Sequence, residues 1–416
     1  MLEIAVIADD LTGAADTGIQ FRALYPHVLL MADNGLAAKP GGRIPEVLAV
    51  HTLSRALPAA QARARIRLAA ERLTLWRPGR VFKKVDSCLR GNIGAEADAL
   101  IDTLGLELSF IAPAFPKVGR TTIEDVHLVH GRPVAESEMG RDPATPVTES
   151  RLSRVIAAQS HHPVGHIELA TVAGSEAKLI AAICRLAKDG ARHIAFDIAE
   201  EDHLATVAGL ALKHFRATLL VGSAGLAQGL CDCQPHRTPK HTARLKAAPG
   251  HHLIALGTAS PRARRQVEAL RAARPFALIE LEAGRLAKTD LVPEEDDLAD
   301  LADALAAGDV IVRIAAPHGE TSARTTRRVA GGFGALIAAL VARTPPASLF
   351  LSGGDTAISV LGRLGARGLR LEREIVPGLV LGTVVGCAFE GLAVGTKPGA
   401  FGDDDALLKW RDTWSG

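Results

Sequence analysis

The feature that most restricts what this chain can fold into is the alternation of short apolar runs with longer segments of helical periodicity. The run IAVIA at Ile4–Ala8 is typical of the first kind, and the stretches Ala59–Arg72 and Ala95–Leu104 are typical of the second. Strands that alternate with helices build parallel sheets covered on both faces, so we predict an α/β fold with mainly parallel sheets. The strands predicted in the first half are Ile4–Ala8, Val47–Val50, Val81–Val85, Ser109–Ala112, His193–Asp197 and Thr218–Val221.

One stretch interrupts this alternation and predicts a boundary between two domains. Residues 234–250, QPHRTPKHTARLKAAPG, contain three prolines and no apolar run, which is typical of a linker. We therefore predict an N-terminal domain over residues 1–233 and a C-terminal domain over residues 251–416, with an interdomain cleft that binds small ligands. The second half is predicted to hold strands at Leu253–Leu256, Ala277–Glu280, Asp309–Ile314, Ser348–Leu351 and Val384–Ala388, and helices at Pro261–Arg274, Pro293–Ala307, Ser322–Ala342 and Thr356–Gly362.

A region from about Ala114 to Glu149 departs from the pattern inside the first domain. It is rich in Pro, Gly, Thr and charged residues and has little periodicity. Loops of this length inside compact domains are usually functional or disordered, and the composition also allows a small hairpin insertion.

The composition argues against several classes of function. The 48 basic and 46 acidic residues give a formal net charge of +2, so neither nucleic acid nor a membrane surface is an expected partner. Aromatic residues make up only 4%, which argues against base-stacking platforms. Five cysteines, an odd number scattered along the chain, indicate free thiols in a reducing compartment. With no recognisable signal peptide, this predicts a cytoplasmic protein whose homo-oligomeric state is left open.

Ligands of open parallel sheets bind beyond the carboxyl ends of the strands, so the residues after each strand are the candidates for chemistry. Asp9 and Asp10 follow the first strand and could bind hydroxyls or act as a base. One of them is expected to cap the next helix, and Asp9 is the better candidate for the cap. Arg55, after the second strand, could bind a carboxylate through its guanidinium fork.

The third strand runs into Lys83, Lys84, Val85 and Asp86, which places two cations and an acid at the end of an apolar element. Strand alternation puts Lys84 and Asp86 on one face and Lys83 on the other. An anionic polyol such as a sugar acid would match this set, because cations suit its carboxylate and acids suit its hydroxyls. The alternative is a salt-bridged turn at the surface.

Two strand–loop–helix elements in the second half predict a phosphate site. Ser260 precedes a helix that Pro261 opens, so it is either an N-cap or a phosphate contact. After the strand at Ser348–Leu351, two glycines allow a close approach of the backbone to a phosphate, and the helix dipole favours its charge. The alternative is a plain glycine turn with an aspartate cap. Neither loop matches the Walker A pattern. The candidate residues of this second loop and of the glycine-rich tail are Gly353, Gly354, Asp355, Thr356 and Gly399.

Metal-ligand spacings are weak in this sequence. His161, His162 and His166 lack a third-ligand pattern at a known zinc spacing, and Cys231 and Cys233 have no partner pair. No metal ligands are therefore predicted.

Seven segments, in this order, resemble the four-carbon acid sugar kinases: ADDLTGAADTG, KKVDSCLRGNIGAE, APAFPKVGRTT, RDPATPVTES, GTASP, SGGDTA and KPGAFG. The resemblance runs from about residue 4 to residue 404. The N-terminal signature with NIGAE and RDPATPVTES is most similar to the D-threonate kinases, with the D-erythronate and 3-oxo-tetronate kinases as relatives.

The resemblance implies a sugar-acid-binding N-terminal domain and an ATP-binding C-terminal domain that works with Mg²⁺. It implies phosphorylation of the terminal 4-hydroxyl of a four-carbon sugar acid in carbohydrate catabolism. Two residues differ from the family pattern: Cys88 stands where the family usually has Thr, and Asp355 stands where many members have Glu. The substrate-binding positions of the family match Asp10, Arg55, Lys83, Lys84, Val85 and Asp86, and its ATP-binding positions match Ser260, Gly353, Gly354, Asp355, Thr356 and Gly399.

The expected mechanism has Lys83, Lys84 and Arg55 holding the substrate carboxylate, while either Asp10 or Asp86 accepts the proton of the attacking hydroxyl. Two rival functions belong to other classes. A non-catalytic sugar-acid sensor would not need two phosphate-type loops. A sugar-acid phosphatase would use Asp9 as its nucleophile, but its signature is Asp-x-Asp, whereas the two acids here are adjacent.

Overall fold

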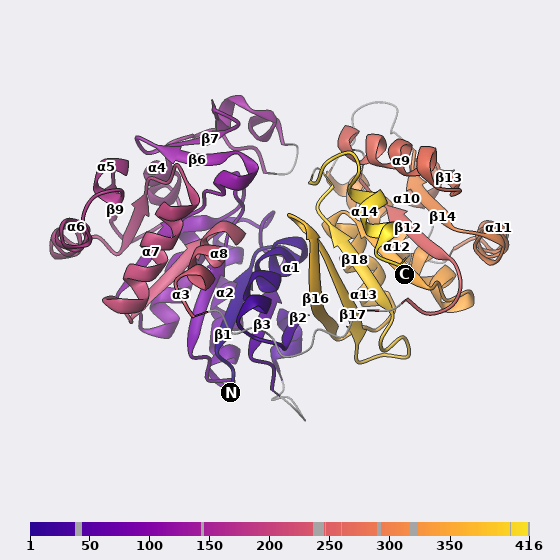
Figure 1. The fold of residues 1–416 in the computed structure, drawn as a ribbon, viewed down its shortest axis with the longest axis horizontal. Coiled ribbons are helices and arrows are strands. Elements are labelled where there is room, and N and C mark those ends of the chain that lie inside the picture. Colours follow the sequence, from indigo (N-terminus) through magenta and orange to yellow (C-terminus); the bar gives the residue numbers. More distant parts are fainter. Residues whose placement is uncertain are drawn as a thin grey trace. The chain divides into compact units, whose positions relative to one another are not determined.

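The computed structural model describes residues 1–37, 44–142, 145–235, 245, 247–258, 260–288, 293–315, 323–399 and 401–414. These residues form two compact units, one on each side of residue 240 (Figure 1). Most of the predicted linker 234–250, namely residues 236–244 and 246, lies outside the described residues, as does Ser322 at the start of a predicted helix. Among the helices that the structure describes, none is long and apolar enough to cross a membrane.

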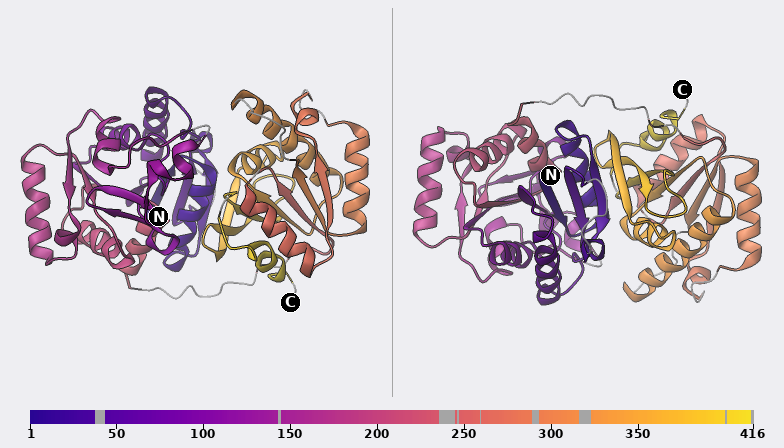
Figure 2. Two further views of the ribbon diagram at one scale, coloured as in Figure 1. Left: turned by 90° about the horizontal axis from the view of Figure 1, so that it is seen from above. Right: turned by 90° about the horizontal axis from the view of Figure 1, so that it is seen from below.

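The sheet of the first unit is parallel in every described strand pair, with helices on both faces (Figures 1 and 2). Its strands follow one another in the order β2 (Val28–Ala32), β3 (Val47–His51), β1 (Ile4–Ala8), β4 (Arg80–Lys84), β11 (Thr218–Gly222), β5 (Leu108–Ala112), β10 (His193–Phe196) and β9 (Val164–Ile167). The helices of this unit are α1 (Leu11–Gln20), α2 (Ala59–Thr74), α3 (Ile93–Leu104), α4 (Leu152–Ala157), α5 (Leu169–Val172), α6 (Glu176–Lys188), α7 (Glu201–Lys213) and α8 (Ala224–Asp232).

Burial on both faces explains why these strands read as continuous apolar runs. All five residues of β1 are buried, and so are all five of β3 and of β5. The main core cluster joins alternate residues of these strands to α2, α3 and α4, with Ile66 and Ile101 among its members. Helices α1, α7 and α8 pack against one another and against the strands without joining that cluster. The sheet is therefore a rigid platform whose carboxyl edge is held in place from both sides.

The irregular region after β5 forms the small hairpin insertion that its composition allowed. Three antiparallel strands, β6 (Arg120–Ile123), β7 (Val126–Val129) and β8 (Arg132–Pro133), make a separate sheet. Figure 1 shows β6 and β7 at the end of the first unit opposite to the N-terminus, which is the end toward which β1 runs. The insertion therefore lies at the carboxyl edge of the main sheet.

The second unit has a mixed sheet with helices on both faces (Figures 1 and 2). Its first five strands are parallel, and the last two continue in antiparallel pairing. The order is β13 (Ala277–Leu281), β14 (Val310–Ile314), β12 (His252–Leu256), β15 (Ser348–Ser352), β18 (Ala393–Lys397), β17 (Leu379–Val385) and β16 (Gly368–Val376). The helices are α9 (Pro261–Ala273), α10 (Ala283–Lys288), α11 (Glu295–Ala307), α12 (Ala323–Arg343), α13 (Gly354–Arg363) and α14 (Ala406–Asp412).

The two units confirm the predicted α/β class with mainly parallel sheets. The predicted strand Val384–Ala388 is wrong beyond Val385, because Gly386 adopts a φ of +83° and turns the chain back toward β18. Edge strands β2 and β9 were missed, as were β16, β18 and all of β17 before Val384. The strands β9 and β16 alternate buried with part-exposed or exposed residues, so they lack the continuous apolar run used to find the others.

Candidate active site

The strand register brings three of the predicted loops to one edge of the first unit. Ala8, the last residue of β1, pairs with His51 at the end of β3 and with Lys84 at the end of β4. The residues that follow these strands therefore leave the sheet side by side. Asn92 links two of the loops directly, since its Nδ2 donates to the carbonyl of Ser54 at 3.1 Å.

Arg55 lies at the centre of this edge and is held by carboxylates from two loops. Its Nε and Nη2 donate to Asp9 at 2.7 and 3.0 Å, and its Nη1 lies 2.9 Å from Oδ2 of Asp10. Its Nη2 is also 3.8 Å from Oδ1 of Asp86. Burial alone would lower the pKa of Arg55, but Asp10, Asp9 and Asp86 outweigh it and hold the pKa well above the usual value. The guanidinium is thus fixed, and it links the aspartates into one cluster.

Asp10, and not Asp9, caps the first helix. Its Oδ1 accepts from the backbone N–H of Gly13 at 2.8 Å, and its Oδ2 accepts from the Thr12 hydroxyl at 2.9 Å. The expectation that Asp9 is the better cap is therefore wrong, because the fork of Arg55 takes both oxygens of Asp9. Burial opposes ionisation of Asp10, yet Arg55 and Lys84 lower its pKa below the usual range. The side chain is 21% exposed, so Asp10 is a cap that remains ionised and accessible.

Asp86 is held even more tightly, by a residue that the sequence reasoning did not single out. Arg90 donates from Nε and Nη2 to the two oxygens of Asp86 at 2.9 and 3.0 Å, and from Nη1 to Asp142 at 3.1 Å. Burial opposes ionisation of Asp86, but Arg90 and Arg55 hold its pKa far below the usual range. A cation four residues after an acid in the same strand exit was the available signal for Arg90.

Lys83 and Lys84 point to opposite faces, as strand alternation predicted. Lys84 lies next to the start of α1, and its Nζ donates to the carbonyl of Val85 at 2.8 Å. Lys83 is fully buried on the other face, with its Nζ 2.5 Å from a carboxylate oxygen of Glu96 on α3. Lys84 thus lies at the same edge as Asp10 and Arg55, whereas Lys83 is paired with Glu96 on the opposite face of the sheet. The predicted contact of Lys83 with a substrate carboxylate stays a prediction.

A pocket of about 480 Å³ opens beside the two arginines within the first unit. Arg55 and Arg90 form one side, and Asn92, Thr148 and Gln159 contribute polar groups to the rest. Sequence reasoning missed this wall, because residues 145–149 come from the aperiodic region and only the fold brings them to the β4 loop. The pocket presents guanidinium and hydroxyl groups together with the carboxylate of Glu149, while the amides of Asn92 and Gln159 already bond to backbone groups.

The hairpin insertion supports the β4 loop through a buried histidine. His127 on β7 bonds through Nε2 to the carbonyl of Ser87 at 2.8 Å and through Nδ1 to the Thr122 hydroxyl at 2.9 Å. Burial lowers the pKa of His127 to about 4, so the ring is neutral near pH 7. A neutral ring donates from Nε2 to the carbonyl and accepts at Nδ1, which fixes the tautomer. The loop that carries Asp86 and Arg90 is therefore anchored from outside the main sheet.

The second unit also brings its predicted loops to one edge. Ser352 at the end of β15 pairs with Leu256 of β12 and with Lys397 of β18. The backbone N–H of Gly353 donates to the carbonyl of Lys397 at 3.0 Å, and Gly353 has a φ of +104°, a conformation that favours glycine. The glycine loops that follow the three strands are thus neighbours.

Glycine is required at two further points of this edge. A Cβ on Gly257 would lie 1.8 Å from the Thr356 hydroxyl, and a Cβ on Gly399 would lie 2.3 Å from the Thr258 hydroxyl. These two glycines therefore let the backbone pack directly against the two threonine hydroxyls.

The predicted residues around these glycines take distinct positions. Ser260 stands at the N-cap position of α9 with Pro261 behind it, but its side chain makes no capping hydrogen bond, so the hydroxyl is not used by the helix. Gly354, Asp355 and Thr356 form the first turn of α13, where Asp355 is exposed and Thr356 is buried.

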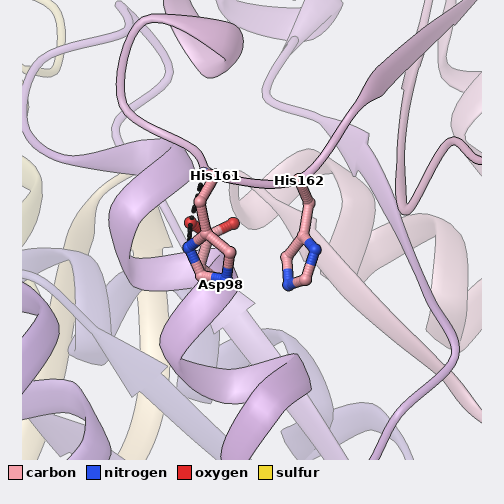
Figure 3. Close-up of side chains that lie close together, drawn as sticks. All are labelled: Asp98, His161 and His162. Atoms are coloured by element: carbon pink, nitrogen blue, oxygen red, sulfur yellow. Dashed lines mark hydrogen bonds and ion pairs between the residues drawn. The ribbon is translucent and has the colours of Figure 1, made fainter.

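One group of potential metal ligands lies away from both edges. Asp98, His161 and His162 offer ligand atoms within 4.8 Å of one another, and Figure 3 shows His161 over the Asp98 carboxylate with His162 beside it. Arg63 already contacts two of these ligand atoms: its Nη1 lies 2.7 Å from Nδ1 of His161, and its Nη2 lies 2.8 Å from Oδ2 of Asp98. A cation in this position neutralises the carboxylate, so the group is built as a hydrogen-bonded cluster.

Comparison with known proteins extends over nearly the whole chain. A family model described as a sugar-binding N-terminal domain matches residues 4–230, and one described as a nucleotide-binding C-terminal domain matches residues 253–407. A D-threonate kinase of Bordetella bronchiseptica is 36% identical, over 98% of this chain and 96% of that kinase. A D-threonate kinase of Salmonella typhimurium is 33% identical, over 98% and 97%. A D-erythronate kinase of Heliobacterium modesticaldum is 30% identical, over 99% and 97%.

Solved structures share the fold. A crystal structure of a Salmonella typhimurium LT2 protein matches with a TM-score of 0.81 at 24% identity, covering 99% of both chains. A Haemophilus influenzae protein matches with a TM-score of 0.74 at 23% identity, covering 99% of this chain and 100% of that one. With a sugar-binding unit, a nucleotide-binding unit and full-length similarity to kinases of three four-carbon acids, the chain belongs to the four-carbon acid sugar kinase family.

Proposed function

We propose that this protein transfers the γ-phosphoryl group of ATP to the 4-hydroxyl of D-threonate. The observation that carries the proposal is the Asp10–Arg55–Asp86 cluster beside a polar pocket in the sugar-binding unit. The glycine edge of the nucleotide-binding unit supplies the complementary phosphate site. D-threonate is favoured because two D-threonate kinases are 33% and 36% identical to the chain. D-erythronate and 3-oxo-tetronate are the alternative substrates, since kinases of these acids are 30% and 31% identical.

In this proposal the pocket holds the acid through the two arginines. Arg55 and Arg90 line it and are half-buried among carboxylates that keep them charged and fixed in direction. The bidentate edge of each guanidinium is already taken by an aspartate, Asp9 or Asp86, so the acid would be held by the remaining N–H groups and by the positive charge. The hydroxyl of Thr148 in the same wall would bind a hydroxyl group of the acid. Lys84, near Asp10, adds positive charge close to the point where phosphate arrives.

Asp10 is our candidate for the group that receives the hydroxyl proton. The Asp86 carboxylate accepts two bonds from the Arg90 side chain and one each from the backbone N–H groups of Cys88 and Arg90. Its side chain is 10% exposed against 21% for Asp10. A low pKa makes either aspartate a weak base. Phosphoryl transfer asks mainly for positioning and charge stabilisation, so a weak, well-placed acceptor is sufficient.

The nucleotide-binding unit would hold the phosphates with backbone N–H groups around Gly353 and Gly399 and with the hydroxyl of Ser260. The positive end of α13 starts at this edge and favours anionic oxygen. Mg²⁺ binds through one or two carboxylates together with phosphate oxygens and water, and Asp355 offers an exposed carboxylate in the first turn of α13. Asp355 would therefore be its protein ligand. The ion neutralises phosphate charge when bound.

The test is ADP release by the purified chain with ATP, Mg²⁺ and each of D-threonate, D-erythronate, their L-isomers and 3-oxo-tetronate. We expect D-threonate to give the highest kcat/KM and the product to carry phosphate on the 4-oxygen by NMR. A higher kcat/KM for another acid would change the proposed substrate but leave the proposed kinase activity unchanged. Release of phosphate from a 4-phospho acid without nucleotide would instead support a phosphatase, and binding of acid without any turnover would support a sensor.

The Arg90 contact gives a separate prediction. Arg90→Met is expected to raise the KM for the acid by about 10- to 100-fold, because one to two charge-assisted hydrogen bonds are lost. The KM for ATP should change little. Lys213→Met, at an exposed position of α7, is the control for loss of one positive charge. Equal KM values for the acid in wild type and Arg90→Met would show that Arg90 serves only to hold Asp86.

A further inference from the structure

Lys397, the last residue of β18, is a buried cation that the proposed reaction leaves without a role. Its side chain is fully buried, and its Nζ donates to the carbonyls of Pro398 at 2.9 Å and Gly399 at 3.1 Å. Among the described residues, no carboxylate acts on it, and the charged group that does is Arg262 on α9. An ammonium group without a counter-charge is costly to bury, so a position that keeps one calls for an explanation.

The place of Lys397 in the sheet supplies that explanation. Lys397 pairs in the sheet with Ser352, whose buried hydroxyl has no hydrogen-bond partner. The backbone carbonyl of Lys397 accepts a hydrogen bond from the N–H of Gly353. Lys397 therefore touches, through its backbone, the double-glycine loop and, through its side chain, the Pro398–Gly399 turn. These are the two loops to which the proposed function assigns the phosphates. An anion at this edge would provide the missing counter-charge.

We propose that Lys397 is a positioning residue of the nucleotide site: it holds the Pro398–Gly399 turn through the two carbonyls, and a triphosphate bound at this edge provides its counter-charge. This inference rests on the proposed function, because it requires that the second unit binds ATP. The ammonium form is the better donor to two carbonyl oxygens, since charge-assisted hydrogen bonds are about twice as strong as neutral ones. Protonation and order of the turn are therefore coupled.

The coupling has a definite sign. Burial and the nearby Arg262 lower the pKa of Lys397 to about 7, so the free protein carries a mixture of charged and neutral Lys397 near neutral pH. A bound triphosphate favours the charged form and raises this pKa. ATP binding must then take up protons above pH 7, and the affinity for ATP must fall as pH rises from 7 toward the pKa of the complex. Only at a pH well below 7 is the residue fully charged in both states, and there it adds no pH dependence.

The experiment is isothermal titration calorimetry of the full chain with ATP and excess Mg²⁺, without sugar acid. Titrations at pH 7.0, 7.5, 8.0 and 8.5 in two buffers of different ionisation enthalpy give the number of protons taken up. We compare wild type with Lys397→Met, which keeps the length and apolar part of the side chain. Lys409→Met, at an exposed position of α14, is the control for loss of a lysine charge in the same unit.

For wild type and Lys409→Met we expect proton uptake that is largest near pH 8. For Lys397→Met we expect at least tenfold weaker binding of ATP at pH 7 and loss of that uptake, with the KM for the sugar acid unchanged. Wild-type affinity and wild-type proton uptake in Lys397→Met would overturn the inference. If Lys397→Met does not fold, the wild type alone decides, because absence of proton uptake between pH 7 and 8.5 also overturns it. Failure of the wild type to bind ATP at any pH would instead reject the proposed function.

Discussion

Asp10→Asn is expected to lower kcat by about 10²- to 10⁴-fold while the protein remains folded, because the variant loses a proton acceptor and a fixed negative charge. Asn caps helices as well as Asp does, so the bond from the Gly13 N–H to the side chain at position 10 can persist. The change thus separates the chemical role of Asp10 from its structural one. Steady-state ADP release gives kcat, and urea unfolding reports the stability.

Two companion variants complete this prediction. Asp10→Ala removes the cap as well and is expected to cost about 0.5–2 kcal/mol of stability in addition to the loss of activity. Asp202→Asn, in the first turn of α7, is the control for removal of an acidic residue at a helix start. Near-normal turnover of Asp10→Asn would reduce Asp10 to a cap. A severe loss in Asp86→Asn at the same time would move the proton acceptor to Asp86.

Lys83→Met is expected to lower the free energy of unfolding by about 3–5 kcal/mol, because Glu96 would be left buried without its partner. The two side chains are 0% and 1% exposed, and the pair lies between β4 and α3. Charge that is removed from water and then unpaired cannot be rehydrated without opening the core. Urea unfolding at pH 7 measures the loss.

The double variant Lys83→Met/Glu96→Leu tests the cause of that loss. It replaces the pair with apolar groups of similar size and should recover most of the stability, since replacing both partners of a buried pair is often neutral. This result would identify Lys83 as support for the edge. If Lys83→Met is instead as stable as wild type but binds the sugar acid much more weakly, Lys83 contacts the substrate as the sequence predicted.

Much of this molecule follows from the sequence because parallel strands buried on both faces read as apolar runs. That signal located β1, β3 and β15, and the shorter apolar run of β4 was found beside them. The rule that ligands bind beyond carboxyl ends then pointed to Asp10, Asp86 and the Gly353 loop. Alternation along β4 also separated Lys83 from Lys84, as the structure shows. These predictions depend only on local chain geometry, which the sequence expresses directly.

Other parts depend on contacts between segments distant in the chain. The choice of Asp10 as cap was decided by Arg55, 46 residues from Asp9, which takes both oxygens of Asp9. Arg90 gains its importance from the cluster around Asp86, and the 145–149 wall gains its importance from its position against Arg55. Lys397 reads as part of a chain-end loop until β18 is placed beside β15. The periodicity and residue spacing of a single sequence do not predict these contacts between distant segments.

The hairpin insertion has a consequence for how acid preference can diverge among enzymes of this type. His127, which anchors the β4 loop, and residues 145–149, which face the arginines, both belong to the single excursion between β5 and α4. The aspartates and the glycine loops belong to the α/β scaffold instead. Under the proposed function, substitutions in that excursion would change the wall of the pocket while the aspartates and the glycine loops stay unchanged. Exchange of this one segment between relatives would then alter the preference for one acid over another.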